Sequence, residues 1–289
     1  MSANPIVAIL NAQHELGYWE KPGPGYATKY RGTVWQLIFL DQLGADAADP
    51  RIRAACAYVL EHSQAATGGF AASGNISSAP PPESRVIHCL NGNLLRALLG
   101  FGWLEDPRVQ RAIEWEARAI TGEPPTHYVG VTSRPGFRCT ANDGQPCAWG
   151  ATKALLALAR VPVNGRTSLV QRAIDQGAEF LLSTDVRSAM YPTRLRDSKP
   201  SPLWFRVGFP SGYVADVLQV VEALCELGYA RDARLSPALE WLLSKQDAHG
   251  RCRNENAYTG RTWVDFERQG RPSKWVTLRA CRVLRTAYG

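Results

Sequence analysis

Three cysteines and a histidine have the residue types to bind a metal ion. Cys139 and Cys147 bracket a polar turn in FRCTANDGQPCAWG, and Cys89 follows His88 in IHCLNG. Thiolates bind zinc well, and a site with three protein ligands leaves one coordination position for water or substrate. We therefore predict zinc on Cys89, Cys139 and Cys147, with His88 or Asp143 as a fourth ligand or as a partner of a ligand. The spacing matches no standard zinc finger, so packing thiols, and a redox pair or nucleophile, are the alternatives.

The other four cysteines have a different setting. Cys56, Cys225 and Cys281 lie inside helix-like segments, where inert core thiols are expected. Cys252 stands where a repeated motif has an aromatic residue, and we interpret it as a spacer. The first residues, MSANPIVAILNAQHELGYW, have no basic segment before a long apolar run, so we expect no export signal, reduced thiols and a cytoplasmic location.

Aromatic residues gather just before, or at the start of, the nearly all-apolar helices described below. Such a collection around one end of a barrel favours a pocket for an apolar or extended ligand. The alternative is that the rings merely close the top of the core. The candidate substrate-binding residues are Tyr30, Trp35, Trp149, Trp204, Phe209, Tyr213, Trp263, Lys274 and Trp275.

Acidic residues in the same positions are the candidate catalytic groups, because a carboxyl group can donate or accept a proton. They are Asp216 in GYVAD, and Asp265 and Glu267 in WVDFE. Ion pairing with an arginine is the alternative for each of them. Basic residues outnumber acidic ones by five to two in segment 184–210 and by six to three in segment 251–274. Such an excess suits phosphate, pyrophosphate or sulfate, and a solvated rim is the alternative.

An internal repeat predicts the elements that must position these residues. Amphipathic helices alternate with helices that are apolar on most faces, such as TVWQLIFLDQLGAD, WGATKALLALARV and KWVTLRACRVLRTAYG. With an opening helix near residues 4–13, this gives five outer and five inner helices. Stacked helical hairpins share a continuous core, so we predict an all-α fold in which residues 1–289 form a single-domain α/α barrel. The other amphipathic segments are 49–64, 106–121, 168–183 and 232–246.

The connections differ in length in a consistent direction. Inner-to-outer connections such as GADAAD are short, whereas the outer-to-inner connections are long. Because the helices alternate in direction, all the long connections should lie on one face, over the N-termini of the inner helices. Residues 71–85 read as a solvated loop that could act as a lid. The long connections are 14–31, 65–90, 122–146, 184–210 and 247–272.

A second repeated element follows the outer helices. QHELGYW and QAATGGF share the spacing Q-x-x-x-G-x-aromatic, and QDAHGRC keeps the glutamine and the glycine. The glycine suits a left-handed helix stop, the glutamine can bond helix ends, and the aromatic can pack back on the preceding turn. The pattern resembles the QW motif of the squalene cyclase and protein prenyltransferase β-subunit superfamily. That resemblance implies an α/α toroid.

The prenyltransferase branch of this superfamily implies a zinc held by an Asp and a Cys before one inner helix and by a His from another. Asp143 and Cys147 in NDGQPCAWG, and His88 in IHCLNG, are the matching positions. The family's Asp-x-Cys spacing is not kept, which argues against prenylation of peptides. The cyclase branch uses a D-x-D-D acid, and neither D-x-D-D nor D-D-x-x-D occurs in this chain.

Composition limits the function classes further. The 289 residues are 45% hydrophobic and carry a net charge of +7, but the charges are scattered along amphipathic helices and form no long basic run. Nucleic acid is therefore not an expected partner, and no stretch is apolar enough for a membrane span. We expect a zinc-dependent enzyme for an apolar, isoprenoid or phosphorylated substrate. The alternatives are a zinc hydrolase of esters or phosphoesters, and a non-catalytic lipid- or partner-binding toroid with structural zinc.

Overall fold

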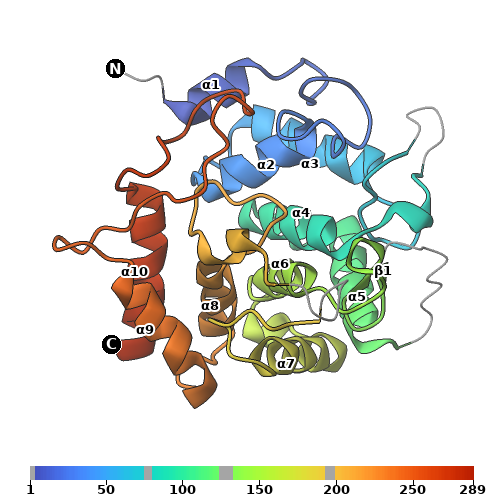
Figure 1. The fold of residues 1–289 in the computed structure, drawn as a ribbon. Coiled ribbons are helices and arrows are strands. Elements are labelled where there is room, and N and C mark those ends of the chain that lie inside the picture. Colours follow the sequence, from blue (N-terminus) through green and yellow to red (C-terminus); the bar gives the residue numbers. More distant parts are fainter. Residues whose placement is uncertain (1–3, 75–79, 124–132, 193–198) are drawn as a thin grey trace.

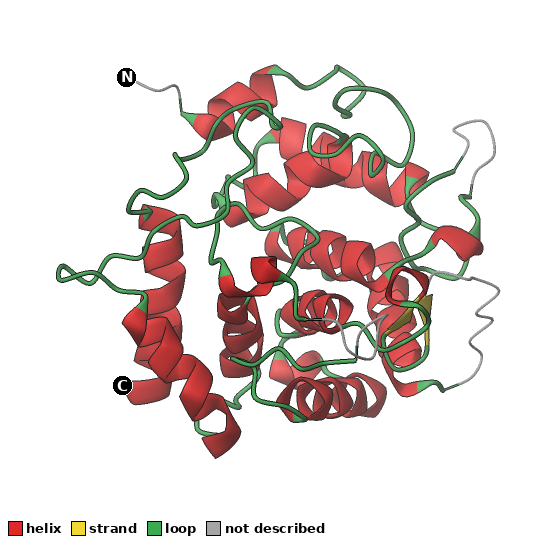
Figure 2. Ribbon diagram, in the orientation of Figure 1, coloured by secondary structure: helices red, strands yellow, loops and turns green. Residues whose placement is uncertain are grey.

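Helices dominate the chain, as the all-α prediction requires (Figure 2). The structure is a computed structural model and describes residues 4–74, 80–123, 133–192 and 199–289. Within these residues lie ten α-helices, five short 3-10 helices and one two-stranded sheet. The α-helices are α1 (Pro5–Asn11), α2 (Thr33–Gln42), α3 (Pro50–His62), α4 (His88–Gly100), α5 (Pro107–Thr121), α6 (Ala148–Leu158), α7 (Ser168–Leu182), α8 (Val217–Glu226), α9 (Ser236–Ser244) and α10 (Lys274–Tyr288).

The shorter elements lie mostly in the connections. The strands β1 (Ser133–Arg134) and β2 (Arg138–Cys139) pair antiparallel between α5 and α6. The 3-10 helices are η1 (Glu83–Arg85), η2 (Thr140–Asn142), η3 (Val163–Gly165), η4 (Pro202–Phe205) and η5 (Ala233–Leu235).

The repeated Asp-Pro-Arg segments start two of the amphipathic helices. The Asp49 carboxylate accepts the backbone N–H of Arg51 at 2.8 Å, and Asp106 accepts that of Arg108 at 2.8 Å. The proline between them occupies the first helical turn, where no N–H is needed. Local sequence therefore sets these helix starts, and α3 and α5 agree with the predicted segments 49–64 and 106–121.

The glutamine of the repeated motif ties successive odd-numbered helices together. The Gln13 side-chain amide donates to the carbonyl of Arg51 at 2.9 Å, and Gln64 donates to that of Arg108 at 2.7 Å. Each accepting carbonyl belongs to the first turn of the next odd-numbered helix, α3 or α5. The motif aromatic Trp19 is fully buried and donates its indole N–H to the preceding helix. The predicted role of the motif at helix ends is confirmed for these two copies.

The even-numbered helices pack on one another in chain order, from α2 through α4, α6 and α8 to α10 (Figure 1). The odd-numbered helices pack against them, with α5 on α4 and α7 on α6. The contact between α4 and α6 is so close that a side chain at Gly92 would overlap the backbone of Lys153. One hydrophobic core runs from α1 to α10.

The last even-numbered helix departs from the expectation. In α10 only four residues are buried, Leu278 is exposed, and so is Cys281, for which we expected an inert core thiol. Cys56 and Cys225 are buried, as predicted. α10 lies at one side of the molecule and packs on α8 and α9 only along one stripe, so its other faces stay in water (Figure 1).

Largely buried ion pairs join the even-numbered helices. Glu222 of α8 bonds Arg279 of α10 at 2.5 Å and Arg96 of α4 at 3.3 Å. Asp41 of α2 bonds Arg160, just after α6, at 2.6 Å. These pairs tie α8 to α4 and α10, and α2 to the end of α6.

No helix in the described parts of the chain is both long and apolar enough to cross a membrane.

Candidate functional site

The three cysteines predicted to bind zinc come together. Cys89 lies in the first turn of α4, Cys139 ends β2, and Cys147 immediately precedes α6. The Cys147 thiol is a hydrogen-bond partner of Cys139. Cys139 lies close enough to Cys89 to raise the pKa of Cys89, and Cys89 in turn raises the pKa of Cys147. All three are free thiols. Residues fifty positions apart in the chain thus meet because α4 and α6 pack so closely at this end.

Cys139 is the thiolate of the group. The neighbouring Cys147 thiol lowers the pKa of Cys139 to about 6, and the backbone N–H groups of Ala141 and Asn142 and the charge of His88 act in the same direction. The same hydrogen bond, together with burial, raises the pKa of Cys147 well above its usual value. The proton between the two sulfurs therefore stays on Cys147. Cys139 is the thiolate at neutral pH and can act as a nucleophile or metal ligand.

Cys89 lies deeper than the other two. Burial raises its pKa to about 11, although Lys153, Lys29 and a hydrogen bond from Tyr26 oppose that rise. At neutral pH it is a thiol until a cation replaces its proton. A bound metal ion deprotonates a coordinating thiol, so the three cysteines can act as one ligand set.

An apolar cavity of about 390 Å³ opens beside two of these thiols. Trp149, Trp204 and Tyr191 form aromatic walls, and Lys199 brings a positive charge to its edge. Trp204 is anchored by its indole N–H, which donates to the Val186 carbonyl at 2.8 Å. The remaining lining residues are Cys139, Ala141, Asn142, Cys147, Ala148, Ala189, Pro192, Pro200 and Ser201.

His88 points away from the thiols. Its Nδ1 donates to Glu116 Oε1 at 2.8 Å, and its Nε2 donates to the carbonyl oxygen of Arg134 at 3.2 Å. Burial disfavours its charge, but Glu116 outweighs burial and the pKa of His88 is raised. Asn91 donates to the second oxygen of Glu116. Because both ring nitrogens already have protein acceptors, His88 holds the β1–β2 hairpin and offers no lone pair to a metal in this arrangement.

The donor set suits zinc in its chemistry, since thiolates are preferred zinc ligands. Among residues 4–74, 80–123, 133–192 and 199–289, however, no group of three or more His, Cys, Asp or Glu side chains has the arrangement of a preformed metal site. Asp143, the other predicted partner, is exposed in the turn between Cys139 and Cys147. Zinc on Cys89, Cys139 and Cys147 remains a prediction.

The predicted aromatic residues divide into separate groups. Only Trp149 and Trp204 line the cavity beside the thiols. Tyr30, Trp35 and Tyr213 form a neighbouring cluster, in which the ring centroids of Tyr30 and Trp35 lie 4.9 Å apart. Trp149 connects the two groups, with its ring centroid 6.1 Å from that of Tyr213.

The other aromatic candidates lie on the α8–α10 side. Phe209 stacks on Trp275 with ring centroids 5.0 Å apart, and the Lys274 ammonium lies 5.0 Å from the Trp275 ring. Trp263 donates its indole N–H to the Arg31 carbonyl at 2.8 Å, under the Arg31 guanidinium. These residues pack loops together and do not line the thiol cavity.

The three candidate acids are also separate from the thiol cavity. Asp216 is buried and caps α8 by accepting the N–H of Gln219 at 2.9 Å, and burial raises its pKa. Asp265 accepts the N–H of Gly260 at 2.8 Å in an exposed turn. Glu267 accepts the N–H of Lys274 at 3.2 Å. Each candidate acid therefore accepts a hydrogen bond from a backbone N–H group.

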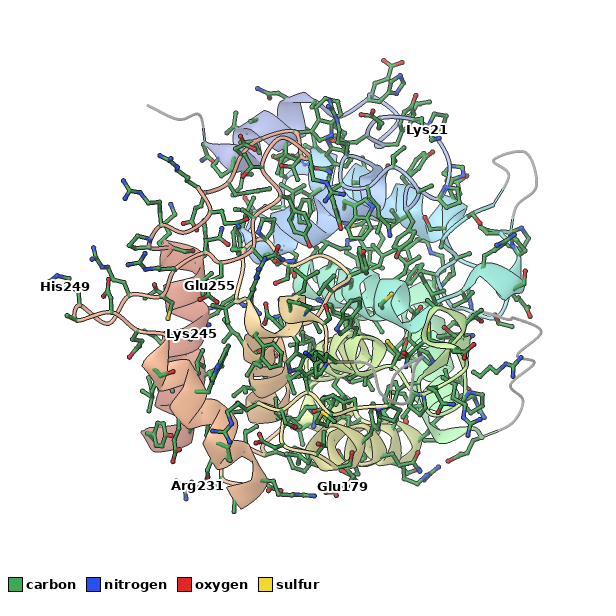
Figure 3. All side chains as sticks on the ribbon, viewed as in Figure 1. Lys21, Glu179, Arg231, Lys245, His249 and Glu255 are labelled. Carbon is green, nitrogen blue, oxygen red and sulfur yellow. The ribbon has the colours of Figure 1, made fainter. Side chains whose placement is uncertain are left out.

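The two basic segments are partly neutralised. Arg187 pairs with Asp185 at 3.3 Å, and Arg251 pairs with Asp247 at 3.0 Å. Glu255, in the connection between α9 and α10, forms an ion pair with Lys245 at 2.9 Å (Figure 3). Two further predicted basic residues, Arg194 and Arg196, lie outside the described residues, as do 75–79 of the predicted lid.

Sequence reasoning missed two buried charged residues, one beside Cys89 and one beside His88. Lys153 is buried in the middle of α6, and burial lowers its pKa to about 7 beside Gln219 and Cys89. It is the only charged residue in WGATKALLALA, which was the available signal. Glu116 is fully buried on α5 and has no comparable signal, since α5 carries several other charges.

Comparisons with known proteins add little at this point. The sequence matches no family model and no curated protein. A solved structure described as a protein from Actinoplanes is similar over 97% of this chain and 72% of that chain, with 15% identity and a TM-score of 0.49. A likeness at that level carries no argument about this chain, so the function has to be inferred from its own residues.

The thiolate assignment makes a measurable prediction. In protein freed of metal by a chelator, iodoacetamide should modify Cys139 with a half-maximal rate near pH 6. A model cysteine peptide should show a midpoint near about 8.5. Cys147→Ala removes the thiol donor, so it should move the Cys139 midpoint toward that of the peptide. Peptide mass spectrometry after short pulses gives the rate at each cysteine. An unchanged midpoint in Cys147→Ala would assign the lowered pKa to the backbone N–H groups and to His88.

Proposed function

We propose that the chain is a zinc-dependent enzyme acting on an apolar substrate of isoprenoid or phosphorylated type. The observation that carries the proposal is that Cys139 and Cys147, beside Cys89, line an apolar cavity of about 390 Å³. A reactive group at the wall of a mostly apolar, concave site is the usual arrangement of a small-molecule active site.

The fold proposal follows the same resemblance to squalene cyclases and protein prenyltransferase β-subunits. The row of even-numbered helices, covered by odd-numbered helices, supports an α/α toroid. The glutamine bonds between successive outer helices support it as well.

The chain's own residues have distinct tasks in this proposal. Cys89, Cys139 and Cys147 hold the metal, which when bound supplies a Lewis acid. Trp149, Trp204 and Tyr191 bind the apolar part of the substrate and exclude water from it. Exclusion of water strengthens every charge interaction at the thiols.

Metal content tests the first half of the proposal. Elemental analysis of purified protein should give about one zinc per chain, and Cys89→Ser, Cys139→Ser and Cys147→Ser should each lose most of it. Cys281→Ser, at an exposed thiol of α10, is the matched control and should keep its zinc. Equal zinc in Cys139→Ser and Cys281→Ser would exclude the thiol site.

Ligand binding tests the second half. Farnesyl diphosphate should bind the zinc-loaded protein, and Ala141→Trp should block it, because Ala141 is an exposed residue of the cavity wall. Zinc without binding or turnover would favour a structural metal. Turnover of simple esters that is lost on chelation and restored by zinc would favour the hydrolase.

A further inference from the structure

Cys139 also borders a second cavity. It has a volume of about 250 Å³ and is lined by Arg134, Arg138, Cys139, Thr140, Asp143 and Gly144. Cys139 therefore belongs to two linings, one apolar and one that contains two guanidinium groups.

The two arginines face the same side of the β1–β2 hairpin. Arg134 and Arg138 are directly opposite in the antiparallel register, and opposite residues project to the same face. Two like charges in that position destabilise a hairpin. Neither guanidinium forms an ion pair with any residue that the structure describes. A bound anion would turn this repulsion into two favourable interactions.

The hairpin that carries the arginines is fixed from several directions. The backbone N–H of His88 donates to Ser133 Oγ at 3.0 Å, and its ring donates to the Arg134 carbonyl at 3.2 Å. The N–H of Cys147 donates to the carbonyl of Phe137 at 2.9 Å. The backbone under both arginines is therefore positioned before a ligand arrives, which lowers the entropic cost of binding.

We propose that Arg134 and Arg138 bind the phosphate-bearing head of an amphiphilic substrate whose apolar part lies in the cavity of Trp149 and Trp204. This inference rests on the proposed function only in placing the apolar part of the substrate. Because Cys139 lines both cavities, a substrate that occupies both would pass beside Cys139. The bond between its head group and its apolar part would then lie next to the thiols. Asp143 contributes an opposing carboxylate to the same lining, which weakens but does not cancel the field of two guanidinium groups.

Inorganic pyrophosphate is the probe for the head-group site. Calorimetric titration of the purified protein should show binding that weakens with salt and drops about tenfold or more in Arg134→Gln/Arg138→Gln. Arg231→Gln, which changes an exposed arginine between α8 and α9, is the control and should bind as the unchanged protein does (Figure 3). Asp143→Asn should tighten binding. Thermal unfolding of each variant checks that the fold is kept.

Farnesol separates this proposal from the proposed function, because it has the apolar chain without the anion. It should bind the unchanged protein and Arg134→Gln/Arg138→Gln equally. Pyrophosphate that binds the double variant as tightly as the unchanged protein would overturn the head-group site. Pyrophosphate binding that depends on the arginines, without farnesol binding, would support the head-group site and contradict the apolar substrate.

Discussion

Replacing Glu222 with alanine is expected to lower the free energy of unfolding by about 3–5 kcal/mol, because it leaves buried charges without their partner. The Glu222 carboxylate lies between Arg279 of α10 and Arg96 of α4, and all three side chains are mostly buried. Arg279 also donates to Ser211 Oγ at 3.0 Å. Neither guanidinium can lose its charge, so both would stay buried and unpaired.

The pH dependence of stability gives an independent check on this network. Burial works against the charge of Glu222, but Arg279 and Arg96 outweigh it and hold its pKa below the usual value. A lowered folded-state pKa stabilises the protein above the unfolded value of about 4.3, and this contribution is lost as pH falls through the lowered pKa. The stability difference between the unchanged protein and Glu222→Ala should therefore shrink in acid.

Glu179→Ala is the matched control. Glu179, which lies on the surface (Figure 3), also pairs with an arginine, Arg234, at 2.8 Å. Both side chains are exposed, so water and salt screen the interaction. Urea unfolding should show a large shift of the midpoint for Glu222→Ala and almost none for Glu179→Ala. Similar shifts in the two variants would mean that the buried network contributes no more than a surface pair.

The helical content could be predicted because its signals are local. The Asp-Pro-Arg starts fix α3 and α5 through bonds between residues two positions apart. The glutamine of the repeated motif bonds a residue far along the chain, but the spacing of the motif repeats and is visible in the sequence. The exposure of α10 could not be predicted in this way, because it depends on which helices pack against it and not on its own pattern.

The sequence predicted which cysteines come together at the candidate site. It did not predict the partners of the charged residues around them. His88 and Cys89 are adjacent on α4, but successive helical residues point about 100° apart, so one faces Glu116 and the other faces the thiols. The aromatic candidates lie before, or at the start of, even-numbered helices, but their rings divide between the thiol cavity, the Tyr30 cluster and the α8–α10 side. The pairing of Arg134 with Arg138 depends on a two-residue ladder that no periodicity reveals.

Glu116→Ala should be as destabilising as Glu222→Ala, and it should also change the chemistry of Cys139. Glu116 is fully buried and accepts hydrogen bonds from His88 and Asn91, so its truncation leaves two buried donors unpaired at a cost of about 3–5 kcal/mol. Glu116→Gln keeps the shape but has one acceptor oxygen in place of two, so it should cost about 1–3 kcal/mol. Glu114→Gln, at an exposed position of α5, is the control and should cost less than about 0.5 kcal/mol.

The effect on Cys139 separates a positioning role of Glu116 from simple packing. The raised pKa of His88 means that the pair stabilises the fold below about pH 6.5, and that this contribution is lost as pH rises through the raised value. The His88 charge also helps to lower the pKa of Cys139. Glu116→Gln should therefore lower the His88 pKa, measured by NMR, and raise the pH midpoint of Cys139 alkylation. A lowered His88 pKa with an unchanged Cys139 midpoint would show that Glu116 stabilises the hairpin without tuning the thiolate.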